Sequence, residues 1–261
     1  MIRFCKFGTF GNCMNLIIDV GNTSIKLAVF EEKKLLIKKV VLEEGLIEAV
    51  NNLNKDYKDI KHVIVSSVGN LGEDIKVYLT KNHQVLYLSH QTKIPFKNLY
   101  ATPNTLGIDR IALIAGAVNQ FPDKNVLVID AGTCITYDFI NSKNEYLGGA
   151  ISPGLRMRYK ALHNQTAKLP LLDTEAIESI IGNTTKTSIN SGVVNGLTVE
   201  IDGIIAQYKE KFSDLTIILT GGDANFLSKQ LKSSIFANSN FLLEGLNFIL
   251  YNNINEWLKN F

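Results

Sequence analysis

Two short segments of the chain repeat one pattern: an apolar run, then Asp, a small or branched residue, Gly, and a polar side chain. The copies span residues 16–23 (LIIDVGNT) and 127–134 (LVIDAGTC). An apolar run without polar alternation is typical of a strand covered on both faces. The Asp then lies where the strand leaves the core, the Gly permits a tight turn, and exposed backbone N–H groups can hold phosphate oxygens. The repeat therefore predicts a duplicated fold that grips one phosphate chain from both sides, with the carboxylates holding its metal ion.

Either copy alone has a simpler interpretation, namely a strand followed by a Gly turn whose Asp forms local hydrogen bonds. A second strand-like run follows each copy, at residues 25–30 and 135–140, which favours the phosphate-binding interpretation. The order strand, turn, strand predicts a β-hairpin, unlike the strand-to-helix turns of P-loop and dinucleotide-binding proteins. Neither of their glycine motifs, G-x-x-x-x-G-K-[ST] or G-x-G-x-x-G, occurs in the chain.

Length and composition exclude several classes of protein. The chain has 261 residues, of which 46% are hydrophobic, enough for one large core or two ordinary ones and too many for a disordered chain. The formal net charge is +2 and long basic stripes are missing, so we expect no nucleic-acid partner. No apolar run approaches the ~18 residues of a membrane span, so we expect no membrane partner.

The three cysteines, Cys5, Cys13 and Cys134, form no C-x-x-C pair. A structural zinc site is therefore not expected. A small and uneven number of cysteines is typical of proteins in a reducing cytoplasm, so the count predicts a cytoplasmic protein. The first residues lack both the continuous apolar stretch and the cleavage site of a signal peptide. We interpret residues 1–14 as an N-terminal tail, with Met14 as a candidate start.

Hairpin strands followed by alternating helices and strands are predicted in both halves of the chain. This repetition indicates an α/β protein of two similar lobes, 15–120 and 121–261, with a cleft between them. The predicted strands are 16–21, 25–31, 34–42, 62–66, 84–88, 126–130, 135–140, 145–151 and 216–219, and the predicted helices are 43–54, 71–80, 111–118, 154–164, 187–212, 224–231 and one that ends the chain.

Two further segments are candidates for the same cleft. In 219–223 a predicted strand runs into a Gly pair before a predicted helix. A ring or ribose can lie against the bare backbone of such a pair, and the helix N-terminus attracts anions. The alternative interpretation is an ordinary βα turn. In Gly107–Arg110, Asp109 is either a helix N-cap or a general base, with Arg110 as an anion clamp. The residues alone do not decide between the alternatives in either segment.

Four motifs occur in a fixed order: 19–23 (DVGNT), 107–110 (GIDR), 130–133 (DAGT) and 148–154 (GGAISPG). This set resembles type III pantothenate kinases, which belong to the acetate kinase/sugar kinase/Hsp70/actin superfamily, and the resemblance runs from about residue 15 to the C-terminus. It implies duplicated ribonuclease-H-like (actin-like ATPase) lobes with an interlobe cleft. It also implies ATP-dependent phosphorylation of pantothenate to 4'-phosphopantothenate, the first step of coenzyme A biosynthesis. The implied enzyme is a homodimer that needs Mg²⁺ and a monovalent cation, K⁺ or NH₄⁺.

The resemblance also implies roles for individual residues. Asp109 would accept the proton of the pantothenate hydroxyl as that hydroxyl attacks the γ-phosphate in line. Asp130 would bind the monovalent cation, and Gly148–Gly154 would lie at the dimer interface. Thr185 would contact the substrate, with Thr184 as its rival. The residues assigned to ATP are Asp19, Val20, Gly21, Asn22, Thr23, Ser24, Ile25, Lys26, Thr133, Gly221 and Gly222, and those assigned to pantothenate are Tyr100, Gly107, Ile108, Asp109, Arg110 and Thr185.

Two rival functions are weighed against this one. The first keeps the fold and changes the substrate, as in a sugar kinase or a polyphosphate hydrolase of the same superfamily; the Gly107–Arg110 motif argues against it. The second is a binding-only accessory factor in transcriptional regulation, as some relatives of this family were first described. That role predicts missing carboxylates, whereas Asp19, Asp109 and Asp130 are all present.

Overall fold

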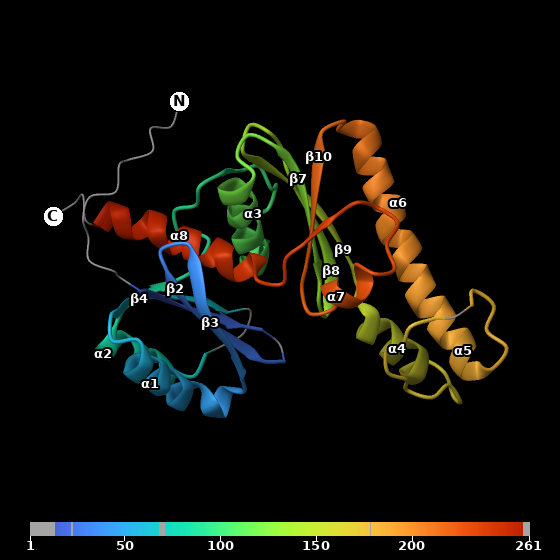
Figure 1. Ribbon diagram of the computed structural model, residues 1–261, viewed down its shortest axis with the longest axis horizontal. Coiled ribbons are helices and arrows are strands. Elements are labelled where there is room, and N and C mark those ends of the chain that lie inside the picture. Colours follow the sequence, from blue (N-terminus) through green and yellow to red (C-terminus); the bar gives the residue numbers. More distant parts are fainter. Residues whose placement is uncertain (1–13, 22, 68–70, 178, 258–261) are drawn as a thin grey trace. The chain divides into compact units, whose positions relative to one another are not determined.

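The computed structural model describes residues 14–21, 23–67, 71–177 and 179–257 (Figure 1). The predicted tail falls outside these residues except for Met14, which begins the first strand. The chain forms two compact units. Unit 1 contains Met1–Pro95, Asn104–Gly116 and Leu243–Phe261, and unit 2 contains Phe96–Pro103 and Ala117–Leu242. The units are interleaved along the chain, which differs from a single division after residue 120.

Unit 1 is built on a five-stranded sheet in the order β3-β2-β1-β4-β5. The first three strands pair antiparallel, and β4 and β5 add in parallel to β1 and β4. The hairpin predicted around the first phosphate turn is therefore confirmed as β1–β2. The strands are β1 Met14–Val20, β2 Ile25–Glu31, β3 Lys34–Val41, β4 Ile60–Ser67 and β5 Gln84–Tyr87.

Helices cover both faces of this sheet (Figure 1). Helices α1 (Leu46–Asp56) and α2 (Glu73–Asn82) bury their apolar sides in one cluster with alternate residues of β1, β2 and β4. On the other face, α8 (Phe241–Trp257) is tied to β1 through Asn247, which accepts a hydrogen bond from the buried Asn15 amide at 2.9 Å. Since successive strand residues point to opposite faces, continuous apolar strands of this kind need both layers.

Helix α3 (Ile108–Gln120) carries the predicted base and packs against α8. The two helices approach so closely that a Cβ on Gly245 of α8 would lie 1.9 Å from the carbonyl oxygen of Ala112 in α3. Only glycine fits at this crossing, because a side chain there would overlap backbone atoms. Helix α3 is thus supported, at Ala112 and Gly116, by a helix from the C-terminal part of the chain.

Unit 2 is built on a six-stranded sheet in the order β11-β10-β7-β8-β9-β6. Strands β7, β8 and β9 form an antiparallel meander, which confirms the second predicted hairpin, and β10 and β11 add in parallel. Apart from the short edge strand β6, this is the strand order of unit 1. The strands are β6 Lys97–Asn98, β7 Asn125–Ala131, β8 Cys134–Ile140, β9 Glu145–Pro153, β10 Leu215–Thr220 and β11 Phe236–Ala237.

One face of this sheet packs against helices α4 (Leu155–Asn164), α6 (Gly196–Lys211) and α7 (Ala224–Leu227) in a single apolar cluster. The single helix predicted over 187–212 is confirmed, because helical backbone runs without interruption from Thr185 to Lys211. The segment contains α5 (Thr185–Asn190), a π-helical turn (Ser191–Asn195) and then α6. The helix predicted over 224–231 was too long, because α7 ends at Leu227.

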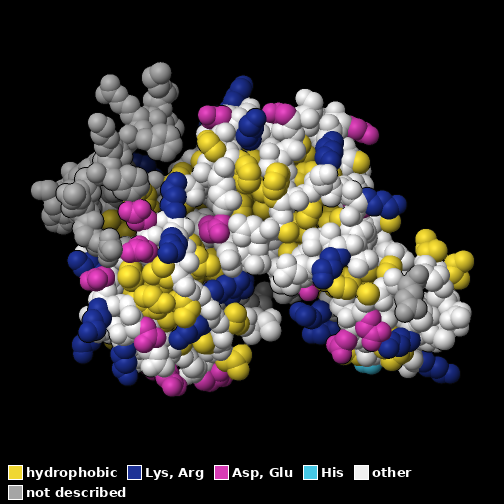
Figure 2. All heavy atoms as spheres, in the orientation of Figure 1, with side chains coloured by type: hydrophobic (Ala, Val, Ile, Leu, Met, Phe, Trp, Pro, Cys, Tyr) yellow, Lys and Arg dark blue, Asp and Glu magenta, His cyan; other side chains and the backbone are white. Residues whose placement is uncertain are grey.

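The described part of the chain contains no helix with both the length and the apolar content that a membrane span requires. On the face shown in Figure 2, Lys and Arg side chains alternate with Asp and Glu rather than gathering by sign.

Candidate active site

The first phosphate turn joins β1 to β2 and is closed by its own backbone. The Gly21 N–H donates to the Ser24 carbonyl at 3.1 Å, and Thr23 between them is exposed. Asn22 lies outside the described residues. Asp19 and Lys26 flank the turn in register and form an ion pair at 3.2 Å. The turn therefore presents hydroxyl side chains and backbone above a carboxylate–lysine pair.

Asp19 lies deep at the end of β1, with 5% of its surface exposed. Burial raises the pKa of its carboxyl above the usual range; Lys26 opposes this rise, and the negative charge of Asp109 adds to it. On its other side, Asp19 lies in register with Ser66 at the end of β4. The Ser66 hydroxyl is buried and has no hydrogen-bond partner among the described residues.

Asp109 lies in the first turn of α3, one residue after the helix begins. The strict N-cap interpretation therefore does not hold, although Asp109 Oδ1 accepts the Arg110 backbone N–H at 2.8 Å. A Cβ on Gly107 would lie 2.4 Å from that same oxygen, so a side chain there would displace the Asp109 carboxylate. Arg110 is 5% exposed. The structure thus brings Asp109 close enough to Asp19 within unit 1 for its charge to raise the pKa of the Asp19 carboxyl.

The second phosphate turn joins β7 to β8 and is one residue shorter than the first. The Gly132 N–H donates to the Cys134 carbonyl at 3.0 Å, and Thr133 is exposed between them. Gly154 supports the turn by donating its N–H to the Thr133 carbonyl at 3.1 Å. Because the turn is shorter, Thr136 takes the register position beside Asp130 that Lys26 takes beside Asp19.

The Gly221–Gly222 turn lies against the carboxylate of Asp130. Gly221 has φ +95°, and a Cβ on it would lie 2.3 Å from Asp130 Oδ1 and 2.4 Å from the Ala131 carbonyl oxygen. The Asp223 N–H donates to the same carbonyl at 2.9 Å. Unit 2 therefore places the Gly pair, Asp130 and the second phosphate turn together, as the sequence predicts.

The remaining predicted residues of unit 2 are Tyr100 and Thr185. Tyr100 stacks on Tyr146 of β9, with ring centroids 6.1 Å apart. Thr185 begins α5 and follows the helix cap, Thr184, whose hydroxyl accepts the Thr187 N–H at 3.2 Å. The Thr184 hydroxyl is thus engaged in capping the helix, and the choice between the two threonines stays a prediction.

Comparison with known proteins decides the family. The family model for type III pantothenate kinases matches residues 15–207 of the chain, and a Christiangramia forsetii protein of that name is 56% identical over 91% of this chain and 98% of its own length. The chain belongs to the type III pantothenate kinase family. More distant members confirm it: the Bacteroides fragilis protein is 46% identical over 92% of this chain and 99% of its own length.

Solved structures confirm the fold class of this type III pantothenate kinase family member. A Campylobacter jejuni protein, described as a proposed Baf family transcriptional activator, has a TM-score of 0.59 at 22% identity and covers 92% of this chain and 99% of its own. A proposed N-acetylmannosamine kinase from Listeria monocytogenes has a TM-score of 0.53 at 11% identity, covering 93% and 100%. At these identities the likeness concerns the fold alone.

The donor set of this family member suits hard cations. Asp130 directs a carboxylate oxygen to the position that a side chain on Gly221 would fill, and carboxylate and carbonyl oxygens are what such ions bind. The described residues include no group of three or more His, Cys, Asp or Glu side chains that could hold a metal. Mg²⁺ that arrives with a nucleotide needs no such cage, because phosphates and water supply most of its ligands.

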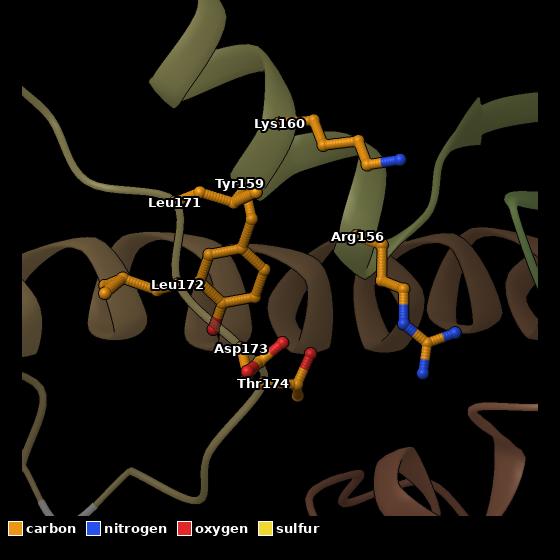
Figure 3. Close-up of a pocket in the computed structure, with 7 residues that line it drawn as sticks. All are labelled: Arg156, Tyr159, Lys160, Leu171, Leu172, Asp173 and Thr174. Carbon is orange, nitrogen blue, oxygen red and sulfur yellow. The ribbon is translucent and has the colours of Figure 1, made fainter.

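A separate pocket of about 230 Å³ lies between α4 and residues 171–174 (Figure 3). No predicted site residue of this family member lines it. Arg156 at its edge contributes to the electrostatics of Asp223, whereas Arg158 is held by Glu200 in an ion pair at 2.5 Å. The lining residues are Arg156, Tyr159, Lys160, Leu171, Leu172, Asp173 and Thr174.

Two residues beside the candidate site were not predicted from the sequence, Ser66 and Tyr146. Ser66 had a signal, since its strand ends in small polar residues, but its position beside Asp19 comes from the structure. Tyr146 had none, because its stacking on Tyr100 depends on a two-residue edge strand. The convergence of both units' residues on one cleft stays a prediction.

Proposed function

We propose that the protein transfers the γ-phosphoryl group of ATP to the primary hydroxyl of pantothenate and so forms 4'-phosphopantothenate, the first step of coenzyme A biosynthesis. Relatives named type III pantothenate kinase align over nearly the whole chain. The observation that carries the proposal is the pairing of a partly exposed Asp109 with a buried Asp19 beside the first phosphate turn.

Asp109 is the proposed general base. Its Oδ1 is engaged by the Arg110 N–H, so we assign Oδ2 to accept the proton from the attacking hydroxyl. A carboxylate can serve as a base when the hydroxyl is held within hydrogen-bond reach. The rest of the proposed pantothenate site is Tyr100, Gly107, Ile108, Arg110 and Thr185, with Arg110 on the pantothenate carboxylate.

The two phosphate turns are proposed to hold the ATP phosphates. Backbone N–H groups, Thr23, Ser24 and Thr133 would bind phosphate oxygens, and Lys26 would exchange part of its contact with Asp19 for a phosphate. Such preorganised donors stabilise charge on the transferring group. When bound, Mg²⁺ would neutralise charge on the phosphates. Asp19, which flanks the first phosphate turn, is the carboxylate that would face it.

Asp130 is proposed to hold the monovalent cation, K⁺ or NH₄⁺. Its register neighbours on β8 and β10 are Thr136 and Thr220, which are neutral oxygen-bearing residues. The cation, held by unit 2, would offset phosphate charge, as Lys26 of unit 1 would.

A homodimer with the Gly148–Gly154 segment at its interface is part of the proposal. Strand β9 pairs with β6 only at Glu145 and Tyr146, so the remainder of β9 is a sheet edge. Leu147 and Ile151 on that edge are 48% and 64% exposed. Exposed apolar side chains on an unpaired edge are typical of an interaction surface.

The deciding experiment measures ADP release from ATP by purified protein, with and without pantothenate, in K⁺ and then in Na⁺ buffer. Pantothenate-dependent release stimulated by K⁺ supports both the substrate and the cation. Hydrolysis or tight ATP binding without a response to pantothenate would keep the fold and direct the search to sugars and polyphosphate. No nucleotide turnover with any acceptor would favour the binding-only role.

A further inference from the structure

We propose that Tyr146, held by the buried carboxylate of Asp138, is a positioning residue that fixes the orientation of Tyr100 and thereby sets the affinity for the acceptor substrate. This inference rests on the proposed function, in which Tyr100 contacts pantothenate. All of the residues that carry it lie in unit 2.

The segment that bears Tyr100 is attached to the sheet by very little backbone. Its strand β6 has two residues, and the Lys97 and Leu99 N–H groups donate to the carbonyls of Asn144 and Tyr146, both at 2.9 Å. These bonds flank a strand pairing of only two residues, which is short for an edge strand. Side-chain packing must therefore supply much of what holds Tyr100 in place.

Tyr146 supplies that packing. Its ring is fully buried and lies between two aromatic rings of the Tyr100 segment. Tyr100 stacks on it at 6.1 Å with an interplanar angle of 23°, and Phe96 meets its edge at 6.2 Å and 70°. Both geometries are favourable for aromatic pairs.

Gly148 allows the Tyr100 ring to lie close to the backbone of β9. Its φ is +112°, and a Cβ on it would lie 3.3 Å from Cδ2 of Tyr100. The left-handed backbone favours glycine, and the missing side chain lets the ring approach this closely. Tyr100 thus packs against both the Tyr146 ring and the bare backbone at Gly148.

The orientation of Tyr146 itself is fixed from the core. Its hydroxyl donates to Asp138 Oδ1 at 2.7 Å, and Asp138 is fully buried in β8. A buried carboxylate must be hydrogen-bonded, so this contact holds the Tyr146 ring in a single position. Loss of the hydroxyl would loosen the ring on which Tyr100 stacks without touching the phosphate turns.

The chain contains a matched control in the same sheet. Tyr137, next to Asp138 in β8, is also fully buried and donates its hydroxyl to a carboxylate, that of Glu200, at 3.1 Å. Its ring belongs to the apolar cluster with α4 and α6, on the opposite face of the strand from Asp138. Tyr137→Phe therefore removes a similar hydrogen bond that has no contact with the Tyr100 segment.

The test compares Tyr146→Phe with Tyr137→Phe by steady-state kinetics and by hydrogen exchange of a peptide covering residues 96–103. We expect Tyr146→Phe to raise the KM for pantothenate by about three- to tenfold, to leave kcat and the KM for ATP within about twofold, and to speed exchange in that peptide. Tyr137→Phe should lower the melting temperature without any of these changes.

A Tyr146→Phe variant with wild-type KM and wild-type exchange would overturn the inference, as would an equal rise in KM in Tyr137→Phe. If Tyr146→Phe does not fold, Asp138→Asn keeps an acceptor oxygen and should raise KM in the same direction by less; unchanged KM and exchange there would also overturn it. Wild-type protein that ignores pantothenate would instead defeat the proposed function, and the exchange comparison alone would then decide whether Tyr146 holds the segment.

Discussion

Asp19 and Asp130 end equivalent strands of two sheets that share one strand order, but their register neighbours differ in charge. Asp19 lies between Lys26 on β2 and Ser66 on β4. Asp130 lies between Thr136 on β8 and Thr220 on β10. The second turn is one residue shorter, which places a threonine where the first unit has its lysine. The duplicated carboxylates are therefore expected to have different roles.

Replacement of Asp109 by Asn should lower kcat by about 10²- to 10⁴-fold, because a general base contributes roughly that much. ATP binding, measured by calorimetry, should stay within a few-fold of wild type. The matched control is Asp74→Asn, since Asp74 also lies in the first turn of a unit 1 helix. Full turnover by the Asp109→Asn variant would show that Asp109 is not the general base.

Replacement of Asp130 by Asn should weaken the stimulation of turnover by K⁺ over Na⁺, because the carboxylate beside Gly221 would lose its charge. The measurement is initial rate against K⁺ concentration at fixed ionic strength. An unchanged K⁺ response would move the cation site elsewhere.

Replacement of Gly221 by Ala should destabilise the protein and raise the KM for ATP. A left-handed backbone costs a non-glycine residue about 1–2 kcal/mol, and the new Cβ would overlap Asp130 Oδ1 and the Ala131 carbonyl. Gly222→Ala is the control for stability, since a Cβ there would meet nothing within 4 Å. Urea unfolding of both variants checks the prediction, and equal losses would contradict it.

Replacement of Asp19 by Asn should abolish turnover yet raise the melting temperature at neutral pH. Burial raises the folded-state pKa of Asp19 above 3.8, so its ionisation costs folding free energy as pH rises through the folded pKa. The difference in melting temperature between variant and wild type should therefore be smallest near pH 4 and grow as pH rises through the folded-state pKa, at about 2–4 °C per kcal/mol.

Lys26 is partly exposed, so water can replace Asp19 as its partner in the Asp19→Asn variant. The exposed Asp74→Asn variant serves as control and should follow wild type at every pH. A melting-temperature difference for Asp19→Asn that shrinks as pH rises would contradict the assigned direction of the pKa shift.

The sequence predicts both hairpins and the two turns well, because an apolar run with Asp and Gly at its end leaves few alternatives. It does not predict β6 or β11, since two-residue strands are defined by their neighbours and not by their own pattern. The apolar stripe of 187–212 continues through a π-helical turn that the stripe does not show. There, Asn195 donates to the Ser191 hydroxyl at 3.1 Å, inside a five-residue π-helical turn.

The candidate site divides in the same way. Asp19, Asp109 and Gly221 are predictable because each combines a reactive or permissive residue with a strand end or a helix start. Tyr146 is not, because its importance depends on which ring stacks on it. A residue that acts through another residue leaves no local signature in the sequence.

The close crossing of α8 over α3 has a consequence for synthesis. Asp109 belongs to a helix whose supporting partner, α8, is synthesised about 130 residues later. At a synthesis rate of ~5–20 residues per second, α8 is made on the order of ten seconds after α3, and most of unit 2 is synthesised between them. A nascent chain can thus complete the second unit's sheet first, and the proposed base takes its final position only after α8 has been made.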